Sequence, residues 1–459
     1  MNHKEPHRVT TFAVLRWLIL GVFVTSLLIT GCIWRNLNQP LENRLQSMRA
    51  SGLPTSASEL NTYYDIPSDS TNETQAWVSA IDSLLNAAKS LPHPLHELTE
   101  IPFPPPPLAE PCSEHEICRQ FINQLDDKYQ RIRVAASRPG LVRYPIDCKA
   151  GVMSMLSTTS KIRQVAALLV LDAGISAHQG QHSRILDDIK TIDALSDTLQ
   201  RGPMVIHFYV RSAIYSVGGH EVEKWLSYCD WSDTELESIQ TAILSAHFEE
   251  EAVRCLIGDL AHGLTEYRKI TLGPFRPSTE LEFVNLIQDA IDSFSAPWPE
   301  PWNLAGKVES RLTLQDQQPL SSLRYYKLTP IGGALTQFTR TVAHSVAKQR
   351  CLCLLIAAQR FRLKSGRLPH SLDEIDHTLL GPGAAMPELR LDPFNGLPLR
   401  FRSDTEEISI YSVGKNLIDD GGETASPTTQ LRDVGFKLLQ KKMIYDPVTR
   451  LFDDKSAER

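Results

Sequence analysis

Residues 162–199 have the sequence IRQVAALLVLDAGISAHQGQHSRILDDIKTIDALSDTL, which decides the class of fold. Apolar residues recur at helical spacing in both halves of this stretch, and a polar segment around Gly180 separates the two halves. The apolar positions are Ile162, Val165, Ala166, Leu169 and Ala173, followed by Ile185, Ile189, Ile192 and Leu199. The stretch therefore predicts two antiparallel helices joined by a short turn.

The same periodicity extends to both sides of this stretch. Upstream, an apolar helical stripe begins at Phe121, and downstream Pro203 opens a further helix. Ser232 and Glu235 form a capping-box pattern, which predicts the start of a long helix toward Leu264. Successive helix pairs of this kind resemble tetratricopeptide-type arrays in architecture, although no fixed repeat period is found. We therefore expect a mainly α protein with a body of antiparallel helical hairpins.

An apolar segment near the N-terminus predicts a membrane anchor. Residues 17–34 contain no charged side chain, and as a helix they would extend about 27 Å, close to the hydrocarbon thickness of a bilayer. Trp17 and Trp34 suit the two interfaces, and Arg16 and Arg35 lie where their side chains can reach the headgroups. We expect a single-pass protein of the cell membrane with this segment as an N-terminal membrane helix.

Two forms of this tether remain open. Residues 28–32, Leu-Ile-Thr-Gly-Cys, resemble the lipobox of bacterial lipoproteins, which implies cleavage before Cys32 and lipidation of that cysteine. The alternative is an uncleaved signal anchor, because the region before the segment is long for a lipoprotein and the apolar run continues to Trp34. Both forms place the bulk of the chain outside the cytoplasm.

Composition and charge limit the class of protein. Of the 459 residues, 42% are hydrophobic, which is enough for a packed core and for more than one domain. The net charge is −7 and no dense basic run occurs, which argues against a broad electrostatic attraction to nucleic acid or anionic lipid. The partners we expect are the membrane, through the N-terminal segment, and a protein of the cell envelope.

The helical pattern gives way to a different one near the C-terminus. A last long helix is predicted from Thr329 to about Lys364. Two alternating runs, residues 397–402 and 407–412, then flank a polar turn and predict an antiparallel hairpin. We expect a small C-terminal α+β module that contains this hairpin.

Residues 349–423 resemble the C-terminal module of type II secretion pseudopilins. The matching residues are Gly366 with Pro369, Asp392-Pro393-Phe394-Asn395-Gly396, Tyr411-Ser412-Val413-Gly414, and Asn416 with Asp419-Asp420-Gly421-Gly422. The resemblance implies a long helix that leads into a small antiparallel sheet, and an Asp-rich loop that binds calcium. The pilin processing signal is absent, and a long helical body separates the module from the membrane segment, so a pilus subunit is not implied.

The loop of residues 414–423 is the best candidate for a site. Asn416, Asp419, Asp420 and Glu423 offer the hard oxygen ligands that calcium prefers, and two adjacent glycines let backbone carbonyls turn inward. The alternative is a solvated acidic turn that closes the hairpin, because the spacing is not that of an EF-hand. The resemblance implies a structural metal ion, not a catalytic one.

Other side chains offer weaker candidates. Cys112 and Cys118 lie in a polar, Pro-rich stretch, where an oxidising compartment would allow a disulfide. His247 and Glu250 have the spacing of a helical ligand pair, but the His-Glu-x-x-His pattern is missing, and a surface helix is the simpler interpretation. No serine-hydrolase elbow, phosphate loop or paired-cysteine zinc pattern occurs in the sequence.

The whole layout resembles a group of single-pass membrane proteins of planctomycete bacteria that has no established activity. The residues that carry this resemblance are Arg49-Ala50-Ser51-Gly52-Leu53-Pro54, Asn72-Glu73-Thr74-Gln75, the helical middle and the ending at 411–422. We divide the chain into a membrane anchor or lipoprotein signal (1–35), a helical neck (36–91), a Pro-rich spacer (92–118), a helical body with an irregular connection (119–330), a long helix with the pseudopilin-like module (331–423) and a C-terminal tail (424–459).

The function we expect is that of a membrane-tethered extracytoplasmic scaffold or interaction protein. Its helical pairs would supply a contact surface, and the C-terminal module a cap stiffened by calcium. Two alternatives are an extracytoplasmic hydrolase without a recognisable motif and a pseudopilin-like component of a secretion system. A deep pocket with converging carboxylates or histidines would favour the hydrolase, and a shallow surface the scaffold.

Overall fold

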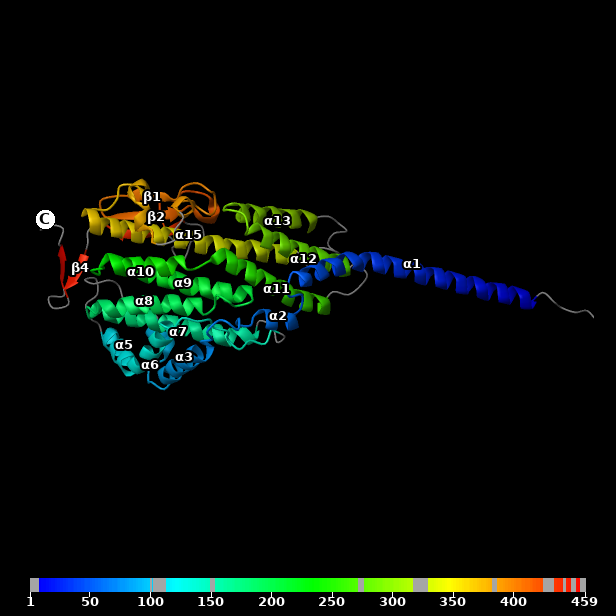
Figure 1. The fold of residues 1–459 in the computed structure, drawn as a ribbon, viewed down its shortest axis with the longest axis horizontal. Helices are drawn as coiled ribbons and strands as arrows, with labels where there is room; N and C mark the ends of the chain where they lie inside the picture. The colour runs from blue at the N-terminus through cyan, green and yellow to red at the C-terminus, as the bar shows by residue number, and fades with distance from the viewer. Residues whose placement is uncertain are drawn as a thin grey trace, which may run out of the picture.

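One long helix projects from a body that is itself mainly helical (Figure 1). The computed structural model of the chain describes residues 8–99, 101, 113–148, 153–270, 276–316, 329–381, 386–423, 433–440, 443–446 and 451–454. At some positions inside helices and strands, residues 27–34 among them, the description covers the backbone alone. Helices account for 69% of the structure, which confirms the predicted mainly α class.

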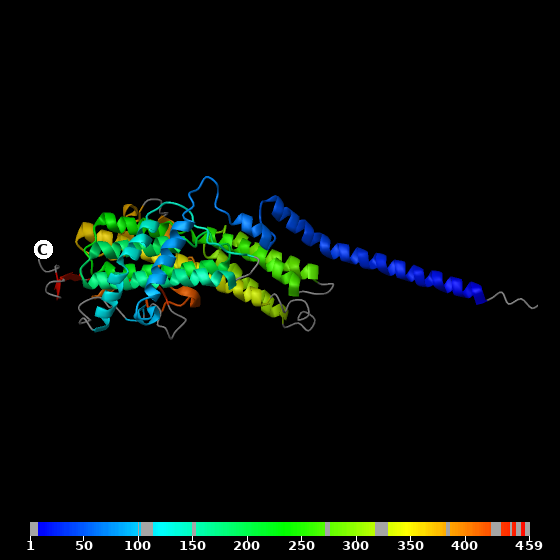
Figure 2. The ribbon, with the colours of Figure 1, turned by 90° about the horizontal axis from the view of Figure 1, so that it is seen from below.

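The projecting helix is α1 (Arg8–Ala50), which is 43 residues long and extends about 65 Å. Its C-terminal part packs against α12 (Arg276–Ser293) and buries Leu41, Leu45 and Met48. The N-terminal part stands clear of the body in two perpendicular views (Figures 1 and 2). The body is therefore attached to α1 by only the last turns of that helix.

Helices α2 to α8 form one half of the body around a shared apolar core. Helices α7 and α8 are antiparallel neighbours joined through Gly180, whose φ is +68°, and they confirm the hairpin predicted from residues 162–199. The bounds in this half are α2 Ala57–Tyr63, α3 Thr74–Lys89, α4 Leu95–Thr99, α5 Ser113–Gln124, α6 Asp126–Ala136, α7 Met153–His178 and α8 His182–Asp197.

The segment expected to be a neck is divided between α1 and the body. Residues 36–50 continue α1 without a break, whereas α3 packs against α6 and α7. Trp77 and Leu84 of α3 are buried in the same core as Tyr129 and Leu169. The expected spacer contains α4 and the start of α5, and its residues 102–112 lie outside the described part of the chain. The apolar face of α3 explains the difference, because it needs a packing partner.

The other half of the body consists of α9 (Val205–Leu226), α10 (Asp233–Leu244), α11 (Phe248–Ile270), α12 and α13 (Glu300–Asp316). The capping box at Ser232 is confirmed, since its side chain accepts from Glu235 N while the Glu235 side chain accepts from Ser232 N. The long helix predicted to follow it is instead split into α10 and α11. Three glutamates in the first turn of α11 favour a new helix start there, because they face its positive dipole end.

The irregular connection expected before residue 330 contains α12 and α13. The Pro-rich pattern was misleading because Pro277 and Pro301 are each the second residue of a helix, where a proline lacks only a hydrogen bond that the first turn does not make. Trp298 and Trp302 hold the link between these helices in place. Trp298 donates to Glu249 Oε1 at 2.8 Å, and Trp302 packs edge-on against Phe394.

Helix α15 (Thr329–Ser365) lies at the centre of this half and confirms the long helix predicted there. Each residue from Cys351 to Ala358 is at most 1% exposed, so this part of α15 is covered on every side. Helices α9, α10 and α13 pack on it, and the C-terminal sheet covers its remaining face (Figure 1). Gly366 ends it with a φ of +80° and donates to Arg362 O at 2.9 Å.

The C-terminal module contains a three-stranded antiparallel sheet in the order β1–β2–β3. Strands β1 and β2 confirm the predicted hairpin, and short helical turns precede and follow them. The bounds are η1 Leu372–Glu374, η2 His377–Leu379, α16 Met386–Leu389, β1 Arg400–Ser403, β2 Glu407–Ser412, η3 Gly414–Asn416, β3 Val434–Leu439, β4 Met443–Asp446 and β5 Leu451–Asp454.

Strand β3 comes from the segment expected to be a tail. It pairs along the whole of β2, with Ile410 opposite Phe436, and a β-carbon on Gly435 would lie 2.3 Å from Ile410 O. Ile408 and Phe436 are buried against α15. The run Val434–Leu439 does not alternate between polar and apolar residues, so periodicity alone does not identify it as a strand. Strands β4 and β5 form a separate antiparallel pair.

The described side chains of the helices do not settle whether the predicted anchor spans a membrane. Within the part of the chain whose side chains the structure describes, no helix is both long and apolar enough to cross a membrane. The side chains of residues 27–34 lie outside that part, so the anchor at residues 17–34 stays a prediction.

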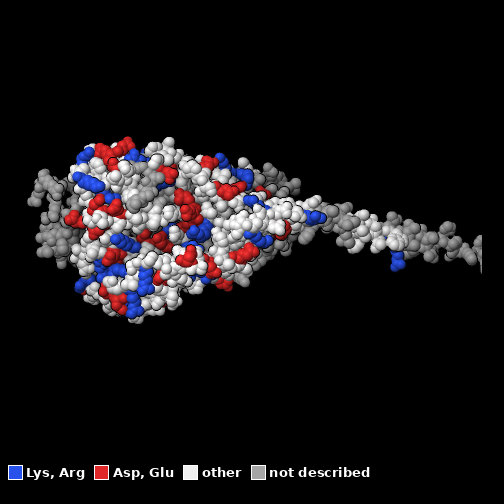
Figure 3. All heavy atoms as spheres, in the orientation of Figure 1, with Lys and Arg blue, Asp and Glu red and all other residues white. Residues whose placement is uncertain are grey.

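On the face of the body shown in Figure 3, positive and negative side chains are interspersed.

Candidate functional site

The loop predicted to bind calcium follows β2 and folds back on it. Asp419 Oδ1 accepts hydrogen bonds from Tyr411 Oη and Gly421 N, both at 3.0 Å, and Asp419 Oδ2 lies 3.4 Å from Arg400 Nε. Asp420 Oδ2 accepts from Asn416 Nδ2 at 3.0 Å. The carboxylates of this loop are therefore engaged by donors of the protein itself.

A carboxylate that sequence reasoning missed lies against this loop. Asp433 immediately precedes β3, is 2% exposed and accepts from Gly422 N at 2.8 Å. Burial raises the pKa of Asp433, and the charges of Asp419 and Asp420 raise it further. No local pattern identifies Asp433, because only the pairing of β3 with β2 brings it here.

The described residues contain no group of three or more His, Cys, Asp or Glu side chains arranged to hold a metal ion. Asn416, Asp419 and Asp420 do lie together, whereas Glu423 is exposed at the end of the described loop. A calcium ion would have to displace the hydrogen bonds that these side chains already make. Calcium at Asn416, Asp419, Asp420 and Glu423 therefore stays a prediction.

Asp392, in the motif shared with pseudopilins, has a structural position. Its carboxylate is 1% exposed and accepts from Ser412 Oγ and Val413 N at 2.8 Å and from Phe394 N at 2.9 Å. These bonds tie the turn before β1 to the end of β2. Asp392 thus holds the module together from inside and does not face a solvent-filled site.

The cysteines singled out in the sequence lie in different settings. Cys32 falls within the helical backbone of α1, but its side chain lies outside the described residues, and so does all of Cys112. Cys118 is buried on α5. Lipidation of Cys32 and a disulfide between Cys112 and Cys118 therefore stay predictions.

Two histidines, the ligand candidate His247 and also His182, lie at the starts of helices. His247 directly precedes α11, where its carbonyl accepts from Glu251 N at 3.1 Å, and Glu250 is exposed. His182 opens α8, and its Nε2 lies 3.2 Å from Glu235 Oε1, with the imidazole ring against Trp231. His247 and Glu250 lie at the exposed start of α11, which agrees with the surface-helix interpretation, whereas His182 is the first residue of α8.

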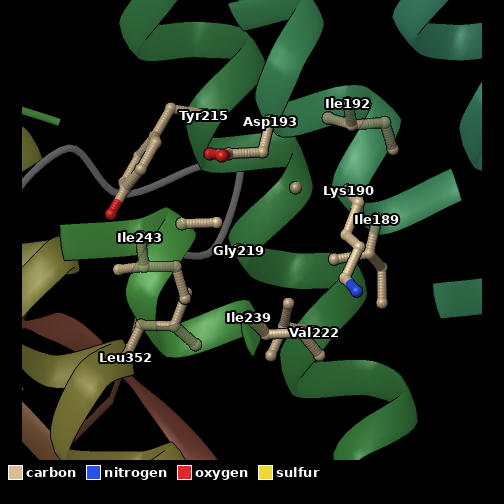
Figure 4. Close-up of a pocket in the computed structure, with 12 residues that line it drawn as sticks. Ile189, Lys190, Ile192, Asp193, Tyr215, Gly219, Val222, Ile239, Ile243 and Leu352 are labelled. Carbon is tan, nitrogen blue, oxygen red and sulfur yellow. The ribbon is translucent and has the colours of Figure 1, made fainter. Parts of the chain in front are cut away.

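A narrow pocket lies between α8, α9, α10 and α15 (Figure 4). Its volume is about 20 Å³, which is room for about one water molecule. Most of its lining is apolar, with Lys190, Asp193 and Tyr215 as polar exceptions. Burial raises the pKa of Asp193 to about 7; the charge of Asp197 adds to this shift and Arg211 opposes it. The pocket is too small to admit an organic substrate.

Two networks of buried charges connect the helices of the body. Arg133 on α6 lies 2.6 Å from both Asp172 on α7 and Asp188 on α8, and Arg184 continues this network to Asp126. A second network connects α9 with α8 and α11 through Arg211, which donates to Asp197 and Glu251. Each charge has a partner on another helix, so these networks fix how the helices are aligned.

One Ser–Lys contact has the residue types of a hydrolytic dyad. Lys348 Nζ on α15 donates to Ser216 Oγ on α9, and burial lowers the pKa of Lys348 to about 8. Ser–Lys pairs act as nucleophile and base in some hydrolases. Both residues, however, lie inside long helices, where backbone N–H groups are bonded within the helix and cannot stabilise an oxyanion. The geometry therefore supports a polar contact between two helices.

Comparisons with known proteins found no relative of this chain. No protein-family model matches the chain, no curated protein is similar to it, and no solved structure resembles it closely enough to count as a match.

Proposed function

We propose that this chain is a membrane-tethered scaffold whose body lies outside the cytoplasm and binds a protein of the cell envelope. The observation that carries the proposal is the exposed apolar surface of the projecting part of α1. Trp17 is 70% exposed, Val22 68% and Phe23 61%, and the body does not cover any of them. A contiguous apolar surface of this kind needs a membrane or a partner to shield it.

The pattern of residues around this surface favours a bilayer over a protein groove. A helix that docks in a groove is apolar on one face, whereas residues 17–34 lack charge on every face and are flanked by Arg16 and Arg35. Tryptophans stand at both ends of the segment, where the interfaces of a bilayer would lie.

Neither the narrow pocket nor the Ser216–Lys348 pair of the body supports hydrolysis. The pocket between α8, α9, α10 and α15 holds about one water molecule, and the Ser216–Lys348 pair lacks backbone donors for an oxyanion. Leu45 of α1 is fully buried, so the helix that carries the tether is anchored in the body, as a scaffold that holds a partner near a membrane requires. The pseudopilin-like module would then present its outer sheet face to that partner.

Protease protection tests the tether and its orientation together. Proteinase K added to intact spheroplasts should digest the body and leave a membrane-protected fragment that contains residues 17–34. Alkaline carbonate should leave the full chain in the membrane, whereas a chain with Leu20→Arg and Val24→Arg should be released. A body that is digested only after the membrane is permeabilised, or a wild-type chain released by carbonate, would contradict the proposal.

A second experiment separates the scaffold from the hydrolase. A fluorophosphonate probe reacts with activated serines, so the purified full chain should remain unlabelled. Labelling at Ser216 that Lys348→Met abolishes would identify a Ser–Lys hydrolase instead. Ser345→Ala is the matched control, because Ser345 lies on α15 within 2.6 Å of Ser212 and does not contact Lys348 in any hydrogen bond of the structure.

A further inference from the structure

A second, wider pocket lies where α2 meets α11 and the loop before α9, on the side of the body nearest to α1 (Figure 1). Its volume is about 200 Å³, and it is lined by Tyr63, Tyr64, Arg201, Pro203 and Arg254. Two of these five residues are arginines and two are tyrosines. The lining is therefore strongly positive, although the chain as a whole has a net charge of −7.

The hydrogen bonds of both arginines of this pocket go to backbone oxygens, and Glu251 acts on Arg254 only through its charge. Arg201 Nη2 donates to Asp65 O at 3.2 Å, and Arg254 Nη1 donates to Gln200 O at 2.8 Å, so both contacts are to backbone carbonyls. Within the described ranges, no carboxylate forms an ion pair with Arg201 or Arg254. Arg201 Nε is shielded from solvent and has no hydrogen-bond partner among the residues that the structure describes.

The carboxylates nearest to the pocket are already engaged elsewhere. Asp65 Oδ1 lies 3.0 Å from Arg143 Nε, Glu251 accepts from Arg211, and Asp259 Oδ1 accepts from Val205 N at 3.3 Å. Burial lowers the pKa of Arg201, and the positive charge of Arg254 lowers it further. Two guanidinium groups thus repel each other in one pocket without a carboxylate ion pair among the described residues, and a bound anion would relieve this repulsion.

The protein holds this pocket rigidly in shape. A β-carbon on Gly258 would lie 1.5 Å from Pro203 O, so α11 and the loop that carries Arg201 are in direct contact. Cys255 Sγ donates to Gly202 O at 3.5 Å, and the Arg254 contact with Gln200 O holds the same loop. Arg201 and Arg254 therefore keep their separation without a ligand, and little ordering is needed when one binds.

Aromatic rings complete the walls. Tyr63 is 36% exposed at the pocket, and Tyr64 is buried with the Arg143 guanidinium 5.1 Å from its ring centroid. A third cation thus lies behind the pocket, although Asp65 partly balances it. We propose that Arg201 and Arg254 form a binding site for a phosphate group carried by a small molecule. Two fixed guanidinium groups match the two negative charges and the several acceptor oxygens of a phosphate monoester.

Inorganic phosphate is the probe for the first test, with the full chain in phosphatidylcholine nanodiscs. Titration at constant ionic strength, with chloride as the balancing anion, should give a saturable rise in melting temperature. Arg201→Gln and Arg254→Gln should each weaken the apparent affinity by about tenfold or more, since each removes one charge and its donors. Arg201→Lys keeps the charge and should lose less affinity for phosphate. This difference between the two substitutions separates a loss of binding from misfolding.

Arg138→Gln is the matched control, because Arg138 is an exposed arginine outside the pocket, 3.6 Å from Glu73. It removes the same charge from the surface and should leave the phosphate response unchanged. A rise that is equal in the wild type and in the Arg201→Gln and Arg254→Gln variants would overturn the proposal. So would a rise that chloride reproduces at the same ionic strength.

A parallel arm distinguishes a free phosphate from a lipid headgroup. The same proteins are melted in nanodiscs that contain phosphatidic acid, without added phosphate. Stabilisation by the lipid that Arg201→Gln removes would identify a headgroup as the source, and stabilisation by inorganic phosphate alone would identify a soluble ligand. Either result retains the phosphate site, whereas the absence of both excludes it. Failure here leaves the proposed tether untouched, because the tether is tested by protease protection.

Discussion

The Cα of Gly258 points at Pro203 so closely that a β-carbon there would lie 1.5 Å from the proline carbonyl oxygen. A real β-carbon never approaches a carbonyl at this distance, so α11 and the loop before α9 touch only because residue 258 has no side chain. The contact joins the two elements that carry Arg254 and Arg201. It therefore links the packing of the body to the shape of the proposed phosphate site.

Gly258→Ala should destabilise the protein by about 2 kcal/mol or more, because the loop or the helix must move apart. A loss of stability would point to the close contact, since a glycine-to-alanine change inside a helix otherwise stabilises the protein by up to about 1 kcal/mol. Gly306→Ala on α13 is the control, because nothing lies within 4 Å of a β-carbon there. Denaturant unfolding of the full chain in detergent measures both, and equal effects would contradict the close contact.

Leu45→Ala should cost about 2–5 kcal/mol, because Leu45 is fully buried where α1 joins the body. Leu20→Ala, on the projecting part of the same helix, should change stability by less than about 0.5 kcal/mol, since Leu20 is 51% exposed. The unfolding midpoint of each variant in detergent checks this contrast. Similar losses at the two positions would show that α1 is not joined to the body at Leu45.

Asp392→Asn should lower the free energy of unfolding by about 1–3 kcal/mol. The carboxylate accepts hydrogen bonds from Val413 N and Ser412 Oγ, and an amide nitrogen in its place would face one of these donors. Asp373→Asn is the control: Asp373 is 89% exposed and pairs only with Arg390 at the surface, so its effect should stay below about 0.5 kcal/mol. Thermal melts followed by circular dichroism compare the two. A neutral Asp392→Asn would show that these bonds add nothing to the module.

Because Glu251 titrates at a higher pH in the folded state, the free energy of unfolding should fall as the pH rises from about 4.5 to 7. Burial raises the pKa of Glu251 to about 7, against the opposing charge of Arg211, so the folded state holds a proton that the unfolded state has lost in this window. The stabilisation that protonated Glu251 provides is fully present below the pKa of Glu251 in the unfolded state. It is lost as the pH passes the pKa of Glu251 in the folded state. At about 1.4 kcal/mol for each pKa unit, it amounts to about 3 kcal/mol at most.

Glu251→Gln keeps the shape of the protonated acid and an acceptor for Arg211, so it should flatten that part of the pH profile. Glu250→Gln is the matched control, since Glu250 is the exposed neighbour on the same turn of α11 and should leave the profile as it is. Melting temperatures between pH 4.5 and 7.5 measure both. An unchanged slope in Glu251→Gln would mean that another group titrates in this range.

Several elements could be predicted because their signals are local. The turn at Gly180 needs a positive φ, and the limits of α15 and of the β1–β2 hairpin follow from periodicity and turn residues within a few positions. The Pro-rich stretch before α15 was wrongly interpreted because Pro277 and Pro301 occupy the first turns of helices. A proline has the same local appearance at a helix start as in a loop, and only the packing around it distinguishes the two.

The sequence by itself determined the mainly helical class, the α7–α8 hairpin, the long α15 and the prediction of an N-terminal tether, since each depends on residues a few positions apart. Only the tertiary structure decided that β3 joins the sheet, that Asp433 lies against the loop of Asp419 and Asp420, and that Arg201 and Arg254 share a pocket. These relations depend on contacts between distant segments, such as the close approach of Gly258 to Pro203, and local periodicity contains no information about them.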